Sequence, residues 1–190
     1  MRLLLLAAAP FLLQESAADP YYKFRPGTTW TYDVVARTKG PNPTKLELKV
    51  SGQDAGVTDL ESRAWKGEGE PRLQMIRWSV KDGILTWAEV RDGAEKDPIQ
   101  VYKPGSKKGD TWEWLEEKRR GKGTHLGTEE VKVPAGTYAD AIHLQFEMQG
   151  EGPKFTLDIH LAAGVGPVRM AAGNAGDSMA YELKEFKPAK

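Results

Sequence analysis

Two alternating stretches of the sequence place histidine and carboxylate side chains where they could bind a metal ion. In both stretches polar residues alternate with apolar ones, and the polar members include His143, Gln145, Glu147, Asp158 and His160. Residues two apart in a β-strand share a face, so these side chains would lie together if the stretches pair as a hairpin. Two imidazoles with carboxylates are a donor set that Zn²⁺ accepts. The alternative is an ordinary solvent-facing surface, which the same alternation predicts.

The turn between the two stretches decides which of these residues would face each other. If residues 151–152 form a two-residue loop, His143 lies opposite His160 and Gln145 lies opposite Asp158. A longer loop is the alternative, because a proline follows the turn. The register of this hairpin therefore determines whether a metal site can form.

Nucleophilic catalysis has weaker support in the sequence. No serine lies in a G-x-S-x-G motif, the signature of the serine hydrolase nucleophile. His125 lies among glycines, which predicts an exposed hairpin tip. Residues 105–109 lack the spacing of a phosphate-binding loop, and no helix is expected after them. We therefore expect no catalytic residues and no cofactor.

Six aromatic residues form the remaining candidate site, because all of them occupy alternating positions of expected strands. They are Trp30, Tyr32, Trp78, Trp87, Trp112 and Trp114. The interior of a barrel of about eight or more strands is either filled by side chains or holds one small ligand. These rings could therefore form the core, or they could line an apolar cavity for a lipid or a peptide side chain.

The elements that would position these residues are short stretches of alternating polarity separated by Gly, Pro, Asn and Asp. Twelve such stretches, some of which we expect to merge or fail, are about 29–38, 45–51, 57–66, 72–80, 84–91, 98–103, 111–119, 127–133, 138–149, 155–162, 167–172 and 178–187. This pattern is typical of antiparallel strands with one wet face. We predict an all-β fold: a single antiparallel meander of about ten strands, curled into a barrel or a half-barrel.

A second hairpin can be registered from its turn. The Asp-Gly dipeptide at 82–83 suits a two-residue type I′ turn, in which both residues need positive φ. The pairing that follows places Val80 opposite Leu85 and Trp78 opposite Trp87. Two indole rings would therefore meet on one face of this hairpin.

The chain also contains a short pattern that occurs twice. Residues 27–32 and 109–114 share the pattern G-x-T-W-x-aromatic, 82 residues apart. A two-fold repeat would divide one domain into pseudo-halves of about 24–104 and 105–187, because about 80 residues of sheet bury little surface alone. Coincidence among similar strand openings is the alternative.

Charge and composition exclude some classes of partner. The 190 residues carry 27 Lys and Arg against 27 Asp and Glu, so the formal net charge is zero. A nucleic-acid-binding protein needs a basic surface, because phosphate contacts dominate its affinity. We therefore expect no nucleic acid as a partner.

The N-terminus has the layout of a secretory leader. Arg2 precedes an apolar run over about 3–13, and small residues lead up to Ala18, which predicts a signal peptide at 1–18 and one domain at 19–190. The run is too short to span a bilayer, which takes roughly 20 residues. A buried first helix is the alternative. Without cysteine the chain has no site for N-terminal lipidation, so we expect a soluble protein of the periplasm or the medium, without a lipid anchor or a transmembrane segment.

Three segments of the sequence resemble a known family. They are 24–32 (FRPGTTWTY), 131–138 (VKVPAGTY) and 164–168 (GVGPV). In order and spacing they resemble exported bacterial β-proteins of a domain of unknown function, described as TapB-like and loosely related to lipoprotein-carrier half-barrels. The resemblance implies export and an all-β fold, and it supplies no catalytic residues. The chain differs from many members in lacking a lipobox cysteine.

The leading functional hypothesis is an exported binding module for a hydrophobic small molecule or a lipid-like group. A cell-envelope module that binds a protein through exposed strand edges is the alternative. A metal-dependent enzyme built on His143, Asp158, His160 and Glu147 is a third hypothesis.

Overall fold

The sheet accounts for the whole regular structure of the described chain. The computed structural model describes residues 21–22, 24–36, 44–54, 56–81, 84–116, 119–149, 154–174 and 177–190. Its strands are β1 (Thr29–Ala36), β2 (Lys45–Asp54), β3 (Val57–Trp65), β4 (Arg72–Lys81), β5 (Ile84–Arg91), β6 (Ala94–Tyr102), β7 (Thr111–Glu116), β8 (Arg119–Val133), β9 (Gly136–Gln149), β10 (Phe155–Ala162), β11 (Gly166–Asn174) and β12 (Asp177–Lys187). This part of the chain includes no helix with the length and hydropathy needed to cross a bilayer. The expected leader at 1–18 and the turns at 82–83 and 151–152 lie outside the described residues.

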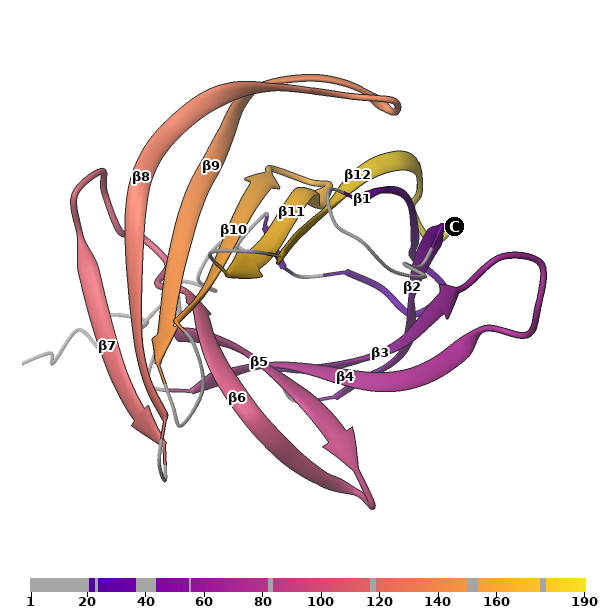
Figure 1. Ribbon diagram of the computed structural model, residues 1–190, viewed down its shortest axis with the longest axis horizontal. Coiled ribbons are helices and arrows are strands. Elements are labelled where there is room, and N and C mark those ends of the chain that lie inside the picture. Colours follow the sequence, from indigo (N-terminus) through magenta and orange to yellow (C-terminus); the bar gives the residue numbers. More distant parts are fainter. Residues whose placement is uncertain are drawn as a thin grey trace, which may run out of the picture.

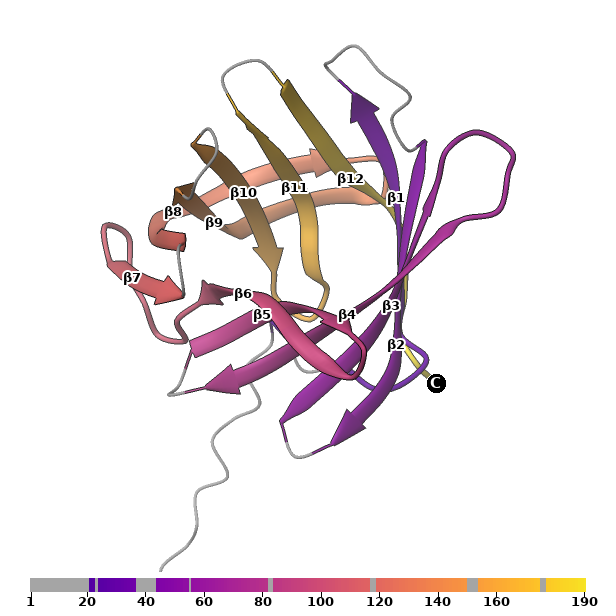
Figure 2. The ribbon, with the colours of Figure 1, turned by 60° about the horizontal axis from the view of Figure 1, so that its bottom comes forward.

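The first and last strands pair at the centre of the sheet. The strand order is β6-β5-β4-β3-β2-β1-β12-β11-β10-β9-β8-β7, with every neighbouring pair antiparallel. Strands β6 and β7 are the two edges, and the sheet curls so that they approach each other (Figure 1, Figure 2). The Trp112 indole N–H on β7 donates to the Gln100 carbonyl on β6 at 2.9 Å. Among the described residues β6 and β7 share no ladder. The predicted antiparallel meander is therefore confirmed, and of the two predicted forms the half-barrel fits.

Twelve strands form where about ten were expected, and one of them differs most from its prediction. Strand β8 begins at Arg119, whereas the sequence pattern predicted a strand only from 127. His125 is therefore a strand residue with 5 % of its surface exposed, and its prediction as an exposed hairpin tip is wrong. The glycines before it indicate a turn by composition, but the structure uses them for packing.

Two glycines of β8 make room for two tryptophan rings of β7. Trp112 pairs with Gly123, and Trp114 pairs with Gly121. A Cβ atom at Gly123 would lie 2.3 Å from the Trp112 ring, and one at Gly121 would lie 2.1 Å from the Trp114 ring. The indoles therefore lie flat against bare backbone, which lets a short edge strand bury large side chains.

Aromatic rings fill the centre of the molecule. Trp30 and Tyr32 on β1 are fully buried. The Phe24 ring packs edge-on against Trp30 with centroids 4.8 Å apart, and Trp78 on β4 lies 6.1 Å from Trp30. The Trp30 indole donates to the Val165 carbonyl at 2.6 Å, and the Tyr32 hydroxyl donates to the Pro167 carbonyl at 2.9 Å. These bonds cross the interior from β1 to the β10–β11 hairpin.

The long β8–β9 hairpin bends over its neighbours. Its ladder contains two irregularities, one between His125 and Gly127 and one between Glu129 and Val131. Gly127 has φ +121°, a backbone conformation that L side chains rarely adopt. At the hairpin tip the Ala135 N–H donates to the Leu183 carbonyl of β12 at 2.9 Å. The bend therefore carries the end of this hairpin back to the middle of the sheet.

Adding a methyl group at Gly123 tests the packing of β7 on β8. Gly123→Ala is expected to lower the free energy of unfolding by about 1–3 kcal/mol, because the Trp112 ring must move to avoid the new Cβ. Gly52→Ala is the matched control, since a Cβ there meets nothing within 4 Å; it should change stability by no more than about 0.5 kcal/mol. Urea unfolding followed by circular dichroism measures both. Equal effects of the two substitutions would contradict the packing.

The Tyr32 hydroxyl makes stability depend on alkaline pH. Burial raises the pKa of Tyr32 well above its ordinary value, and the nearby Tyr138 raises it further. An unfolded tyrosine ionises near pH 10, so this group's contribution is complete below about pH 10 and is lost as pH rises toward the folded-state pKa. The free energy of unfolding should therefore fall more steeply above about pH 10 in the wild type than in Tyr32→Phe. Parallel slopes in urea titrations across that range would argue against it.

Candidate functional site

The predicted hairpin register brings the two histidines together. His143 on β9 pairs with His160 on β10, and Gln145 pairs with Asp158, as expected. The two imidazole rings stack with centroids 4.2 Å apart and planes at 23°. Leu144 is fully buried in the core, so its neighbour His143 points to the other face of the sheet.

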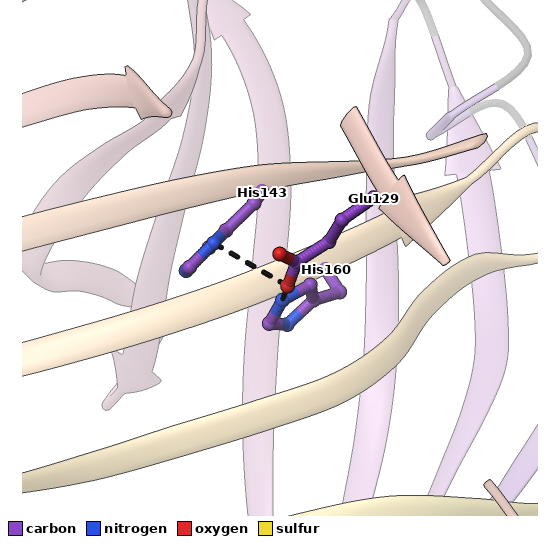
Figure 3. Close-up of side chains that lie close together, drawn as sticks. All are labelled: Glu129, His143 and His160. Carbon is purple, nitrogen blue, oxygen red and sulfur yellow. Dashed lines mark hydrogen bonds and ion pairs between the residues drawn. The ribbon is translucent and has the colours of Figure 1, made fainter. Parts of the chain in front are cut away.

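A glutamate from a third strand completes this group (Figure 3). Glu129 on β8 pairs with Ala141, which places it diagonally beside His143. Its Oε1 lies 2.7 Å from the His160 Nε2 atom and 3.6 Å from the His143 Nδ1 atom. One ligand atom from each of Glu129, His143 and His160 lies within 4.8 Å of the others. We call these three residues the histidine cluster.

Asp158 contacts His143 on the side away from Glu129 and does not belong to the histidine cluster. Its Oδ1 is 3.0 Å from the His143 Nε2 atom, and it accepts a second hydrogen bond from the Gln145 amide at 3.1 Å. These bonds leave His143 with Nδ1 directed toward Glu129. A carboxylate that holds the far nitrogen of an imidazole is the usual orienting partner of a metal-binding histidine.

Of the four predicted ligands, Glu147 and Asp158 lie outside the histidine cluster, and Glu129, which was not predicted, belongs to it. Glu147 lies on the same strand as His143, but its carboxylate bonds to the Lys154 ammonium at 2.6 Å and takes no part in the histidine cluster. Glu129 was missed because it belongs to β8, whose two ladder irregularities hide its register from sequence. The alternation of Val131 and Val133 with charged residues marks this stretch as a strand. A regular strand would put Glu129 on the same face as Val131, and the ladder irregularity between these two residues changes that.

The electrostatics of the histidine cluster favour neutral imidazole beside an ionised carboxylate. Burial lowers the pKa of His160 more than the hydrogen bond to Glu129 raises it. The hydrogen bond from His160 holds the pKa of Glu129 below its ordinary value. Burial acts to raise the pKa of Asp158, but hydrogen bonds from His143 and Gln145 outweigh it and lower that pKa. Neutral imidazoles and an ionised carboxylate are the forms that bind a cation.

The cluster continues into a row of charged residues across the outer face of the sheet. His160 pairs with Arg169, Arg169 with Glu182, and Glu182 with Asp33, so one cation and two carboxylates follow the histidine over four strands. The Arg169 Nε atom lies 3.6 Å from a Glu182 carboxylate oxygen. Only the β8–β10 end of this row presents nitrogen ligands.

The six predicted aromatic residues do not form one site. Trp30 and Tyr32 belong to the core, while Trp112 and Trp114 cover the glycines of β8. Trp78 and Trp87 pair across the β4–β5 hairpin as expected, with ring centroids 5.5 Å apart. This last pair lines a pocket.

The pocket lies inside the curled sheet, between strands that are not neighbours in the ladder. One wall comes from β4, β5 and β6, and the facing wall comes from β10 and β11. The lining residues include Tyr21, Trp78, Leu85, Trp87, Val101 and Ile159. Its volume is about 10 Å³, close to the space that one water molecule needs. Apolar side chains thus fill nearly all of this region.

Two polar atoms of the pocket residues have no partner. The indole nitrogens Nε1 of Trp78 and Trp87 are buried and make no hydrogen bond within the described structure. A buried donor without an acceptor costs roughly 1–3 kcal/mol. An acceptor at either nitrogen would remove this cost.

A serine and a histidine also meet away from these sites. The Ser106 Oγ atom lies 3.1 Å from Nδ1 of His125. In a Ser-His-Asp triad the serine faces Nε2, and Nδ1 faces the carboxylate. Ser106 instead faces Nδ1 of His125, and the His125 backbone is hydrogen-bonded to Gly109 and Asp110, so the pair fixes the loop before β7.

Comparison with known proteins identifies the fold. No family model matches the sequence, and no curated protein matches it at a significant level. Two solved structures are similar to it. A putative lipoprotein from Parabacteroides distasonis ATCC 8503 aligns with a TM-score of 0.59 at 13 % identity, over 89 % of this chain and 99 % of its own. A putative exported protein with a YmcC-like fold from Bacteroides fragilis NCTC 9343 aligns with a TM-score of 0.54 at 14 % identity, over the same shares.

At these identities the likeness shows a shared all-β fold. Because no family model matches, the resemblance to TapB-like proteins stays a prediction.

Proposed function

We propose that the protein is an exported module that binds an apolar ligand with an oxygen acceptor between Trp78 and Trp87. The observation that carries this proposal is that two tryptophans whose side chains line an apolar pocket each have a buried indole N–H group without a partner. A carbonyl, ester or carboxylate oxygen would accept from these donors. A hydrocarbon chain would pack against the surrounding side chains.

Room for the ligand would come from Tyr21. The pocket as it stands holds at most about one water molecule. Tyr21 belongs to the segment before β1, is half-buried, and packs edge-on against Tyr102 with ring centroids 5.6 Å apart. Moving Tyr21 breaks no strand ladder, whereas moving Leu85 or Ile159 would disturb the sheet. The ligand therefore replaces the Tyr21 ring.

Export is supported by two independent observations. The sequence at 1–18 has the layout of a secretory leader. The two similar structures are described as a putative lipoprotein and a putative exported protein. A binding role is favoured over catalysis, because the Ser106–His125 pair presents the imidazole in the reverse orientation of a triad.

A second candidate function is recognition of an extended protein segment. Strands β6 and β7 are the edges of the sheet in the described chain, and Leu115 on β7 is 73 % exposed. An extended peptide adds to such an edge through backbone hydrogen bonds, with side-chain contacts that give specificity. Leu115→Lys would weaken this function and would leave binding in the Trp78–Trp87 pocket unchanged.

Titration with a fluorescent long-chain fatty acid tests the leading proposal. We expect saturable binding to the folded protein with one site per chain. Trp78→Phe and Trp87→Phe each remove one donor and should weaken binding about tenfold, which corresponds to about one hydrogen bond. Trp65→Phe is the matched control, because Trp65 lies under the Lys45 ammonium and away from the pocket.

Two results would contradict the proposal. One is the absence of saturable uptake by protein whose circular dichroism shows a folded sheet. The other is an equal effect of Trp65→Phe and Trp87→Phe, since that would place the fatty acid outside the pocket.

A further inference from the structure

We propose that Glu129, His143 and His160 form a binding site for a divalent transition-metal ion such as Zn²⁺. The three residues come from β8, β9 and β10, so the ion would join three consecutive strands on the outer face of the sheet (Figure 3). This proposal does not depend on ligand binding at Trp78 and Trp87, which lie on the inner side.

The donor atoms are close to the spacing that a tetrahedral ion needs. Zinc lies about 2.0–2.2 Å from nitrogen and oxygen ligands, which places neighbouring ligand atoms roughly 3.4 Å apart. The Glu129 carboxylate oxygen lies 2.7 Å from one imidazole nitrogen and 3.6 Å from the other. These values lie on either side of the required distance. Small side-chain shifts would therefore suffice for the carboxylate.

His143 is already held in the orientation of a metal ligand. Its Nε2 atom bonds to Asp158, and Asp158 is fixed in turn by the Gln145 amide. The carboxylate keeps the proton on Nε2, so that Nδ1 carries the lone pair directed toward Glu129. Asp158 is thus a positioning residue for His143 and contacts no metal itself.

His160 is the ligand that must rotate. A metal ion lies in the plane of each imidazole that binds it, and the two rings now stack at 23°. Nδ1 of His160 is buried and has no hydrogen-bond partner, so the Nε2–Glu129 bond is the hydrogen bond that orients this ring. Rotation about the side chain breaks that bond alone. The ion would replace it by coordinating both partners.

The remaining coordination position would be open to water. The side chain of Glu129 is 52 % exposed, while that of His160 is 7 % exposed. The ion would therefore contact one buried and one half-buried imidazole and would face the solvent on the glutamate side. Three protein ligands and one exchangeable water are the arrangement of zinc sites that can bind a further ligand.

Equilibrium dialysis of the untagged protein with Zn²⁺, and the visible absorption of Co²⁺ as a substitute, test the site. We expect one ion per chain, a Co²⁺ spectrum typical of low coordination number, and a rise of several degrees in the melting temperature. Glu129→Gln and His160→Asn should each weaken binding at least about tenfold. Asp158→Asn should weaken it about tenfold or more and should alter the Co²⁺ spectrum, because the orientation of His143 changes.

Glu147→Gln is the matched control, because Glu147 lies on the same hairpin and bonds to Lys154. It should bind the ion as the wild type does. Melting curves without metal show whether each variant folds, and His143→Asn gives a second ligand variant if His160→Asn does not. Binding of less than one ion per chain by the wild type would overturn the proposal. So would equal affinity of Glu129→Gln and Glu147→Gln, which would leave only a hydrogen-bonded surface cluster.

Discussion

The packing of Trp30 is the interaction on which the rest of the structure depends. This side chain lies on β1, the strand that joins the two ends of the chain, and it is fully buried. Its ring contacts Phe24 from the N-terminal segment, Trp78 of β4 and Phe186 of β12, and its indole N–H reaches the Val165 carbonyl. A sheet whose edges share no ladder needs such contacts across its interior. The buried rings make these contacts, and their burial stabilises the fold by roughly 25 cal/mol for each Å² of apolar surface removed from water.

The same packing explains why the Trp78–Trp87 pocket and the histidine cluster lie on opposite faces of the sheet. Strand β10 alternates between them, because Ile159 and Leu161 line the pocket while Asp158 and His160 point to the outer face. Side chains fill most of the interior, and a small pocket remains beside Trp78 and Trp87, where Tyr21 of the N-terminal segment forms part of the wall. The outer face stays polar, and its bent β8–β9 hairpin brings Glu129 over the two histidines.

Much of the fold could be predicted from sequence, because strand alternation and short turns are local signals. The pairing of Trp78 with Trp87 and of His143 with His160 followed from them. The prediction of a turn at the glycines of β8 was wrong, because glycine is typical of turns and the sequence does not show that these glycines make room for indole rings. Glu129 could not be placed, because ladder irregularities shift register in a way that depends on distant packing. The unpartnered indole nitrogens depend on three-dimensional neighbours and leave no sequence signal.

The central claim is that two indole N–H groups of the interior bind a ligand oxygen. The most direct measurement is the ¹⁵N–¹H spectrum of the tryptophan side chains, recorded before and after addition of an unlabelled fatty acid. The account predicts that, of the six indole signals, those of Trp78 and Trp87 shift on saturation and that of Trp65 stays in place. Unchanged signals at Trp78 and Trp87, with the fatty acid bound, would contradict it.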